Sequence, residues 1–248
     1  MFELVKRGNN LNVLAISDLH IGNLNDCIDL VDNAYSYAQD KNIKYVLNLG
    51  DLIEGVMPHN KKELRIGTTL EQVDCIIENY PKIDGIKTLM LYGNHDYYSL
   101  YKKDIDVAKV ISSKRRDIYN LGYGEAYIRI LDNYIKLSHE IDLLKGYKKN
   151  IETFVNLVGH LHSFKLKVYD DTLYINVPPL SKVSPNKQIY PPSILDINFI
   201  FYKSLISNVE INLIDMTRNM VIGSFELASS INNKKYVKIK KQLDDYKI

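Results

Sequence analysis

Four apolar, strand-like runs in this chain each end in a short polar segment rich in histidine, aspartate and glycine. The segments are Asp18-Leu19-His20, Gly50-Asp51, Gly93-Asn94-His95-Asp96 and Gly159-His160-Leu161-His162, and His139 follows a further apolar run. Open α/β sheets place their sites at the carboxyl ends of strands, so we expect these side chains to lie close together. Five of the six histidines belong to this set, which indicates a metal centre.

The ordered set of segments resembles the calcineurin-like metallophosphoesterases. The pattern of that family is Asp-x-His, Gly-Asp, Gly-Asn-His-Asp, a lone His and Gly-His-x-His, and all five parts occur in this order between Asp18 and His162. Each part alone is a weak signal, but the complete set is specific. The resemblance implies an α/β fold, a four-layer αββα sandwich in which two mixed sheets are flanked by helices. The metal site would lie at the carboxyl ends of the strands.

The resemblance also implies a dinuclear metal centre and assigns its ligands by position. One metal would be bound by Asp18, His20 and His162, the other by Asn94, His139 and His160, with Asp51 bridging both. A carboxylate suits the bridging position because its two oxygens and its charge can hold two cations about 3.5 to 4 Å apart. Nitrogen and oxygen ligands without thiolate suit two divalent ions, with Mn²⁺ expected first and Fe, Zn²⁺ or Ni²⁺ as alternatives. Glu140, beside His139, departs from the family's pattern.

Such a centre predicts a hydrolase that cleaves phosphodiester bonds by attack of a metal-bridging hydroxide, with His95 assisting the leaving group. Asp96 would either orient His95 or cap the following segment, because a neighbouring carboxylate can fix the tautomer of a general acid. A phosphomonoesterase is the alternative, and a non-catalytic scaffold of the same fold is a third reading.

Charge favours the diester over the monoester. Two divalent ions, two carboxylates and one hydroxide have a net charge of about +1, which a diester monoanion neutralises. Protein-phosphatase relatives place an arginine four residues after the aspartate of Gly-Asp, whereas this chain has Gly55 there. The cation that would compensate a phosphate dianion is therefore missing.

The balance of charged residues bears on which binding partners to expect. The chain has 32 Lys and Arg against 30 Asp and Glu, so no global field marks a nucleic-acid or membrane partner. A nucleotide or nucleic-acid substrate, and hence a nuclease-type enzyme, stays open because lysines occur in loops expected near the site, at Lys61, Lys62, Lys102, Lys103 and Lys145 to Lys149. Two cysteines give no disulfide framework, and the chain lacks a signal-peptide pattern and any run of 18 apolar residues. A cytoplasmic protein is the expectation, and its protein partners are left open.

The length and composition of the chain predict one domain over residues 1–248. Helices are expected over Leu24 to Ala38, Thr69 to Tyr80 and Asp104 to Arg116, alternating with parallel strands. Alternating strands are expected in the second half, and a basic surface helix over residues 232–248. Three of the tyrosines, Tyr97, Tyr98 and Tyr101, fall in an expected loop, where packing is favoured over stacking on a base. His59 is expected to be an ordinary loop residue.

Overall fold

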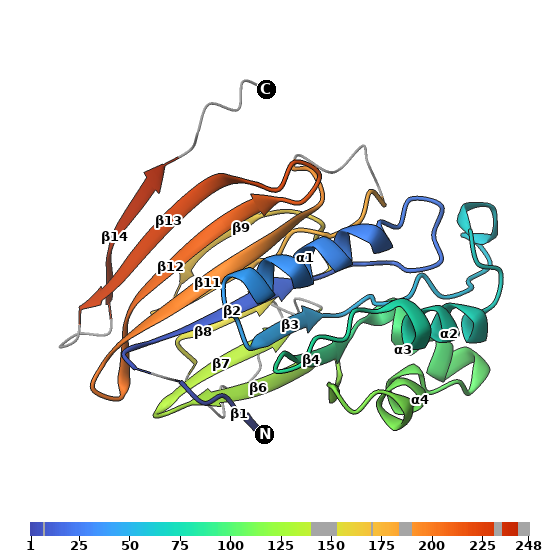
Figure 1. Ribbon diagram of the computed structural model, residues 1–248, viewed down its shortest axis with the longest axis horizontal. Helices are drawn as coiled ribbons and strands as arrows, with labels where there is room; N and C mark the ends of the chain where they lie inside the picture. The colour runs from blue at the N-terminus through green and yellow to red at the C-terminus, as the bar shows by residue number, and fades with distance from the viewer. Residues whose placement is uncertain (7, 140–152, 170, 184–189, 231–234, 243–248) are drawn as a thin grey trace.

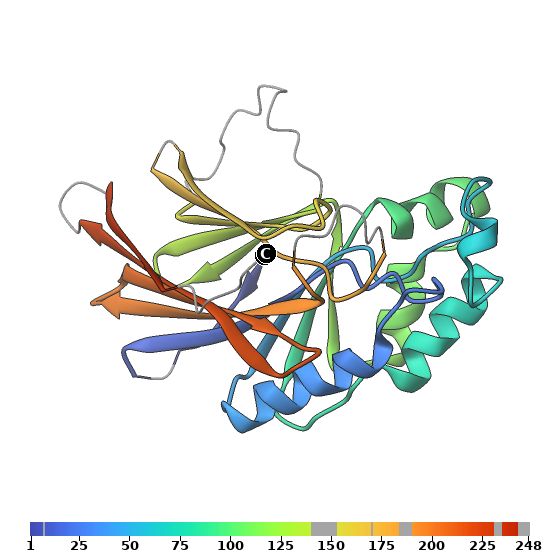
Figure 2. The same cartoon turned by 90° about the horizontal axis from the view of Figure 1, so that it is seen from above.

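Two β-sheets packed face to face form the centre of the protein, as a computed structural model shows (Figures 1 and 2). The structure describes residues 1–248 except residues 7, 140–152, 170, 184–189, 231–234 and 243–248. Both sheets are mixed, and this confirms the predicted α/β fold with two mixed sheets and helices.

The larger sheet has eight strands in the order β14-β13-β12-β11-β2-β3-β4-β5. Their bounds are β2 Asn10–Ile16, β3 Tyr45–Leu49, β4 Lys87–Tyr92, β5 Ile118–Tyr123, β11 Ser193–Tyr202, β12 Leu205–Asp215, β13 Met220–Ser230 and β14 Lys235–Gln242. Strands β2, β3 and β4 pair in parallel, as predicted, β5 continues this parallel set, and β11 to β14 add an antiparallel meander beside β2.

The smaller sheet has six strands in the order β1-β6-β7-β8-β10-β9. Their bounds are β1 Phe2–Glu3, β6 Glu125–Ile130, β7 Asn133–Ser138, β8 Val155–Val158, β9 Lys165–Tyr169 and β10 Thr172–Asn176. A turn at Leu131 and Asp132 joins β6 to β7 in an antiparallel hairpin. Strands β7 and β8 are parallel, so their carboxyl ends lie at the same edge of the sheet.

Alternation of side chains along β2 separates two cores. Val13 and Ala15 belong to the cluster between the two sheets, whereas Leu14 and Ile16 belong to the cluster between the larger sheet and the helices. Strands buried on both faces read as continuous apolar runs. This is why the first-half strands could be recognised in the sequence.

Three of the four α-helices, α1, α2 and α4, pack on the outer side of the larger sheet, and α3 follows strand β4 and contacts α4 (Figure 2). Their bounds are α1 Ile28–Asp40, α2 Thr69–Asn79, α3 Asn94–Lys103 and α4 Val107–Lys114, and a short 3₁₀ helix spans Lys61–Glu63. Within the described ranges no helix covers the outer face of the smaller sheet, so these residues form three of the four predicted layers. In this described part no helix is long and apolar enough to cross a membrane.

Three helices differ from the prediction, and one of them, α4, is shorter, at Val107–Lys114 instead of Asp104 to Arg116. Helix α1 begins at Ile28 rather than near Leu24, because Asp26 accepts a hydrogen bond from the Gly22 N–H and holds a turn before the helix. The segment expected as a loop after His95 is helix α3, which ends where Asp104 adopts a left-handed conformation (φ 56°).

The helix predicted over residues 232–248 is wrong for residues 235–242, which form strand β14, paired antiparallel with β13. Val237 and Ile239 alternate with Lys238 and Lys240, which is the two-residue period of a strand. The free edge of β13 supplies the backbone partners that favour this period over the helical one. The rest of the predicted helix lies outside the described residues.

Candidate metal centre

The predicted site residues follow the carboxyl ends of five strands, three in the larger sheet and two in the smaller one. The segments follow β2, β3 and β4, which are adjacent in the larger sheet, and β7 and β8, which are adjacent in the smaller one. Because each set is parallel, both sheets direct their carboxyl ends to this region. The seven predicted ligands therefore meet although 144 positions separate Asp18 from His162.

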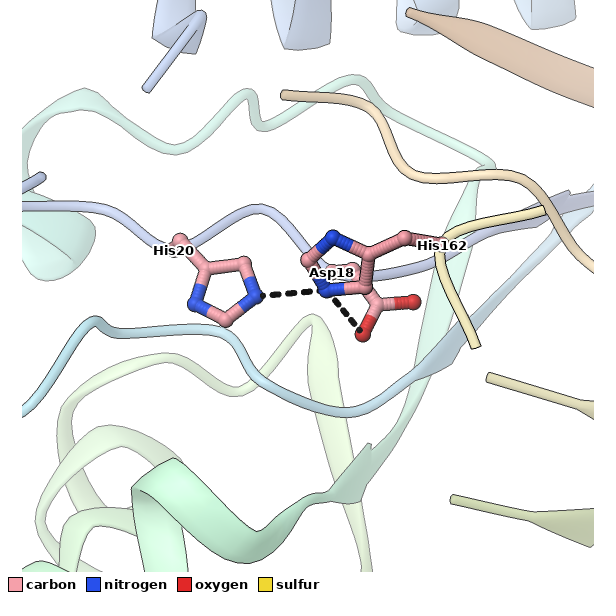
Figure 3. A group of neighbouring side chains, drawn as sticks. All are labelled: Asp18, His20 and His162. Carbon is pink, nitrogen blue, oxygen red and sulfur yellow. Dashed lines mark hydrogen bonds and ion pairs between the residues drawn. The ribbon is translucent and has the colours of Figure 1, made fainter. Parts of the chain in front are cut away.

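Asp18, His20 and His162 form the first cluster (Figure 3). Their nearest ligand atoms all lie within 4.8 Å of one another. The Nε2 atoms of His20 and His162 face each other at 3.1 Å, and Nε2 of His162 is 3.4 Å from Oδ1 of Asp18. Asp18 and His20 are buried, whereas His162 is partly exposed, so the cluster is accessible from one side.

The second cluster contains Asp51, His139 and His160. His139 Nε2 lies 3.0 Å from Asp51 Oδ2 and 3.1 Å from Asn94 Oδ1, so the predicted asparagine also reaches this group. The same Asp51 oxygen is 3.8 Å from Nε2 of His20 in the first cluster. Asp51 thus lies between the clusters, at the position predicted for a bridging ligand.

Hydrogen bonds orient the nitrogen atoms of three of these histidines. Nδ1 of His20 lies 3.0 Å from a Glu54 carboxylate oxygen, Nδ1 of His139 lies 2.7 Å from the Leu49 carbonyl, and Nδ1 of His162 lies 3.3 Å from the Val183 carbonyl. Carbonyl and carboxylate oxygens only accept, so each Nδ1 donates its proton. The lone pair of each neutral ring is then on Nε2, which faces the carboxylates and is available to a cation.

The electrostatics of the site also favour bound cations. Burial opposes ionisation of Asp51, but His139 outweighs it and holds the pKa of Asp51 far below its usual range. Burial lowers the pKa of His139, yet Asp51 and Asp18 overcome it and raise this pKa to about 10. Asp18 likewise raises the pKa of His162 against burial. These buried carboxylates strongly favour positive charge nearby, and divalent metal ions would supply that charge.

The backbone at the site is held in an uncommon conformation. Five of the predicted ligands are in the left-handed region, with φ between 48° and 69°: Asp18, His20, Asp51, His160 and His162. Residues other than glycine rarely adopt this region, so the geometry is stabilised by its surroundings. Gly93 permits the close approach of the strands, because a Cβ there would collide with Asp51 Oδ1 and His139 Nε2.

Glu54 is a site residue that the sequence analysis did not identify as part of the metal centre. It is buried, binds Nδ1 of His20 and accepts a hydrogen bond from Asn60 Nδ2 at 2.8 Å. Burial raises the pKa of Glu54, but its bond to His20 outweighs this and lowers it. The chain beyond β2 pairs with the chain beyond β3, since His20 N donates to Asp51 O and Glu54 N donates to Ile21 O. An acidic residue three positions after Asp51 was the available signal.

His95 and Asp96 have separate environments. His95 Nδ1 lies 2.7 Å from the Glu54 carbonyl, and its Nε2 lies 4.0 Å from Asp51 Oδ2. Its partly exposed ring therefore presents Nε2 to the metal clusters. Asp96 is fully buried and accepts hydrogen bonds from the backbone N–H groups of residues 52, 53 and 93. Of the two roles considered for Asp96, these hydrogen bonds match capping, and Nδ1 of His95 is oriented by the Glu54 carbonyl instead.

Asp96→Ala is expected to lower the free energy of unfolding by about 3 kcal/mol, because it leaves three buried backbone N–H groups without an acceptor. Asp96→Asn keeps an acceptor oxygen and should lose less. Burial and the charge of Asp51 raise the pKa of Asp96 to about 6, so loss of its charge alone is not expected to be costly. Urea unfolding of metal-free protein measures both variants; an alanine variant as stable as the parent would contradict this role.

A model of one protein family, described as calcineurin-like phosphoesterase, matches residues 11–188 of the chain. The chain belongs to this family. The match includes every polar segment of the candidate metal centre, from Asp18 to His162. This member of the family therefore has a candidate divalent metal site, at which His, Asp and Asn side chains meet near the ends of β2, β3, β4, β7 and β8.

Known proteins are similar to this chain over part or most of its length. A manganese-dependent ADP-ribose/CDP-alcohol diphosphatase from Oryza sativa subsp. japonica is 29% identical over 110 residues, which are 43% of this chain and 32% of the rice protein. A solved archaeal phosphodiesterase matches with a TM-score of 0.53 and 16% identity over 82% of this chain and 99% of its own. The phosphoesterase Yfce from E. coli matches with a TM-score of 0.52 and 15% identity over 86% and 98%. These structures share the fold.

Some further polar residues belong to neither cluster or lie outside the described part. His59 is exposed in the loop after Asp51, consistent with an ordinary loop residue. Arg65, in the same loop, pairs with Asp26 at 2.6 Å. Glu140 and the cluster from Lys145 to Lys149 lie outside the described residues.

Proposed function

We propose that this phosphoesterase hydrolyses phosphodiester bonds with two divalent metal ions, Mn²⁺ first among them. The observation that supports this most is the position of Asp51 between two His and carboxylate clusters, with His95 beside them. Divalent ions bound there would activate water and offset the charge of the phosphoryl group. Asp18, His20 and His162 would hold one ion, and Asn94, His139 and His160 the other.

His95 would protonate the leaving oxygen. Its Nδ1 proton is directed at the Glu54 carbonyl, so a second proton can only be held at Nε2, on the side of the clusters. A neutral leaving alcohol needs that proton in the transition state. Glu54 would position His20 through the 3.0 Å bond to Nδ1, as carboxylates beside metal-bound histidines do.

The charges at the site favour a diester over a monoester. Three buried carboxylates, Asp18, Asp51 and Glu54, surround the centre, and among the described residues their ion pairs are all with histidines. Gly55 has φ +66°, and a Cβ there would lie 3.1 Å from the His95 carbonyl oxygen. No cation for a phosphate dianion is supplied at that position. The similarity to a diphosphatase, whose named substrates contain substituted phosphates, supports the same choice.

With Mn²⁺ present, kcat/KM for bis-(p-nitrophenyl) phosphate should exceed that for p-nitrophenyl phosphate by roughly tenfold, the effect of about 1.4 kcal/mol. Both reactions release the same chromophore, so one assay measures both. Dialysis against a chelator should abolish both activities, and returning Mn²⁺ should restore them. Undiminished hydrolysis by metal-stripped protein would contradict the two-metal proposal, and a clear monoester preference would make a phosphatase the better description.

A further inference from the structure

Helix α3 begins at the candidate metal centre and carries exposed aromatic rings away from it. Its first residue, Asn94, lies 3.1 Å from His139 Nε2. Tyr97 and Tyr101 follow three and seven positions later, a spacing that places all three side chains on one face of the helix. At 1.5 Å per residue, the two tyrosines lie about 5 and 10 Å along the axis from Asn94.

The two rings form a nearly parallel pair that the core does not require. Their planes differ by 12°, their centroids are 6.4 Å apart, and the residues are 49% and 67% exposed. Tyr97 is supported by an edge contact with Tyr123, whose hydroxyl donates to Asp106 Oδ1 at 3.1 Å and accepts from the Ala108 N–H at 3.3 Å. The surface is therefore aromatic, accessible and held in place before a ligand binds.

Positive charge accompanies these rings. Lys102 Nζ lies 4.4 Å from the centre of the Tyr101 ring. Lys103 donates to Thr69 Oγ1 at 3.3 Å, and its pKa is lowered by partial burial and by the charge of Lys61. An aromatic surface with several nearby cations fits an anionic ligand that has a planar ring.

We propose that Tyr97 and Tyr101 stack on the nucleobase of a nucleoside phosphate ester whose phosphoryl group lies at the metal centre. The proposal rests on the proposed function for the position of the phosphoryl group. Stacking on aromatic side chains tolerates different bases, because every base has a π face. The substrate class is thus a nucleotide-containing ester, and the tyrosines determine selectivity for it without taking part in bond cleavage.

Tyr202 provides a matched control. It is 54% exposed and has Lys203 Nζ 5.7 Å from its ring centre, which resembles the Tyr101 and Lys102 pair. It ends strand β11, at the turn into β12, whereas the metal centre lies beside the opposite end of that sheet's strand β2. Its replacement removes a similar ring without touching the site.

Calorimetric titration of Mn²⁺-loaded protein with AMP and with ribose 5-phosphate isolates the contribution of the base. The parent should bind AMP about 5- to 100-fold more tightly, the effect expected for one or two stacking contacts. The double variant Tyr97→Leu, Tyr101→Leu should lose this preference while binding ribose 5-phosphate as the parent does. The double phenylalanine variant and Tyr202→Leu should keep it. Should the double leucine variant fold poorly, Tyr101→Leu alone should reduce the preference.

Equal affinity of the parent for AMP and ribose 5-phosphate would overturn the proposal, as would a double leucine variant that retains the full preference. Because the titration measures binding without turnover, its result does not depend on whether the protein hydrolyses phosphodiesters. Protein that prefers AMP but does not cleave bis-(p-nitrophenyl) phosphate would support the stacking surface and contradict the phosphodiesterase activity. Protein that cleaves bis-(p-nitrophenyl) phosphate but shows no preference for AMP would support the phosphodiesterase and contradict nucleobase stacking.

Discussion

Asp51→Asn should abolish phosphodiester hydrolysis, with a loss of roughly 10³-fold or more, and should lower metal content at both sites. One oxygen of Asp51 lies between His139 Nε2 at 3.0 Å and His20 Nε2 at 3.8 Å, so the variant removes a charge from both clusters. The asparagine has nearly the same shape, and the folded structure should persist. Metal analysis by mass spectrometry after gel filtration, together with the diester assay, measures both effects.

Asp196→Asn is the matched control for that experiment. Asp196 is also a buried aspartate in the larger sheet, but it accepts a hydrogen bond from the Tyr37 hydroxyl, away from the metal centre. Its variant should keep two metal ions per chain and most of the activity. Full occupancy of both sites in Asp51→Asn would contradict the bridging role.

His95→Asn should leave metal binding nearly intact and lower kcat by roughly 10² to 10⁴-fold on diesters with poor leaving groups. The expected loss follows from the position of Nε2 near the clusters, with Nδ1 held by the Glu54 carbonyl. An activated leaving group such as p-nitrophenolate needs less help and should lose less. Rates for a series of aryl alkyl phosphodiesters of increasing leaving-group pKa measure this difference.

His59→Asn is the control for the loop side of the site, since His59 is exposed and outside the clusters. Its rates should match those of the parent across the series. An equal loss for all leaving groups in His95→Asn would show that His95 positions the substrate and does not transfer a proton.

The proximity of the candidate ligands could be predicted from the sequence because these residues follow strands that are easy to recognise. Buried parallel strands such as β3 are continuous apolar runs, and their ends are fixed within a residue or two. Once β2, β3 and β4 are adjacent, Asp18, Asp51 and Asn94 must lie at one edge. This inference needs only the topology, which explains why all seven predicted ligands come together.

Residues without such a pattern were missed for physical reasons. Glu54 reaches His20 only because two loops continue the pairing of their strands, which no local spacing reveals. Helix α3 was read as a loop because its apolar content is low and its start depends on backbone hydrogen bonds to Asp96. Strand β14 was predicted to be a helix because its many lysines make the two-residue period of a strand hard to see. Pairing with the edge of β13 then selects the strand, which the local sequence does not show.

The left-handed backbone of the five site residues bears on whether this chain is an enzyme or an inert scaffold. Each such residue costs on the order of 1 kcal/mol relative to one in a common conformation, and glycine would occupy the same positions with less strain. A sequence optimised for stability alone would place glycine there. Aspartate and histidine at these positions give up some stability for a geometry that brings ligand atoms together, which fits a chain that binds metal ions better than one that keeps only the fold.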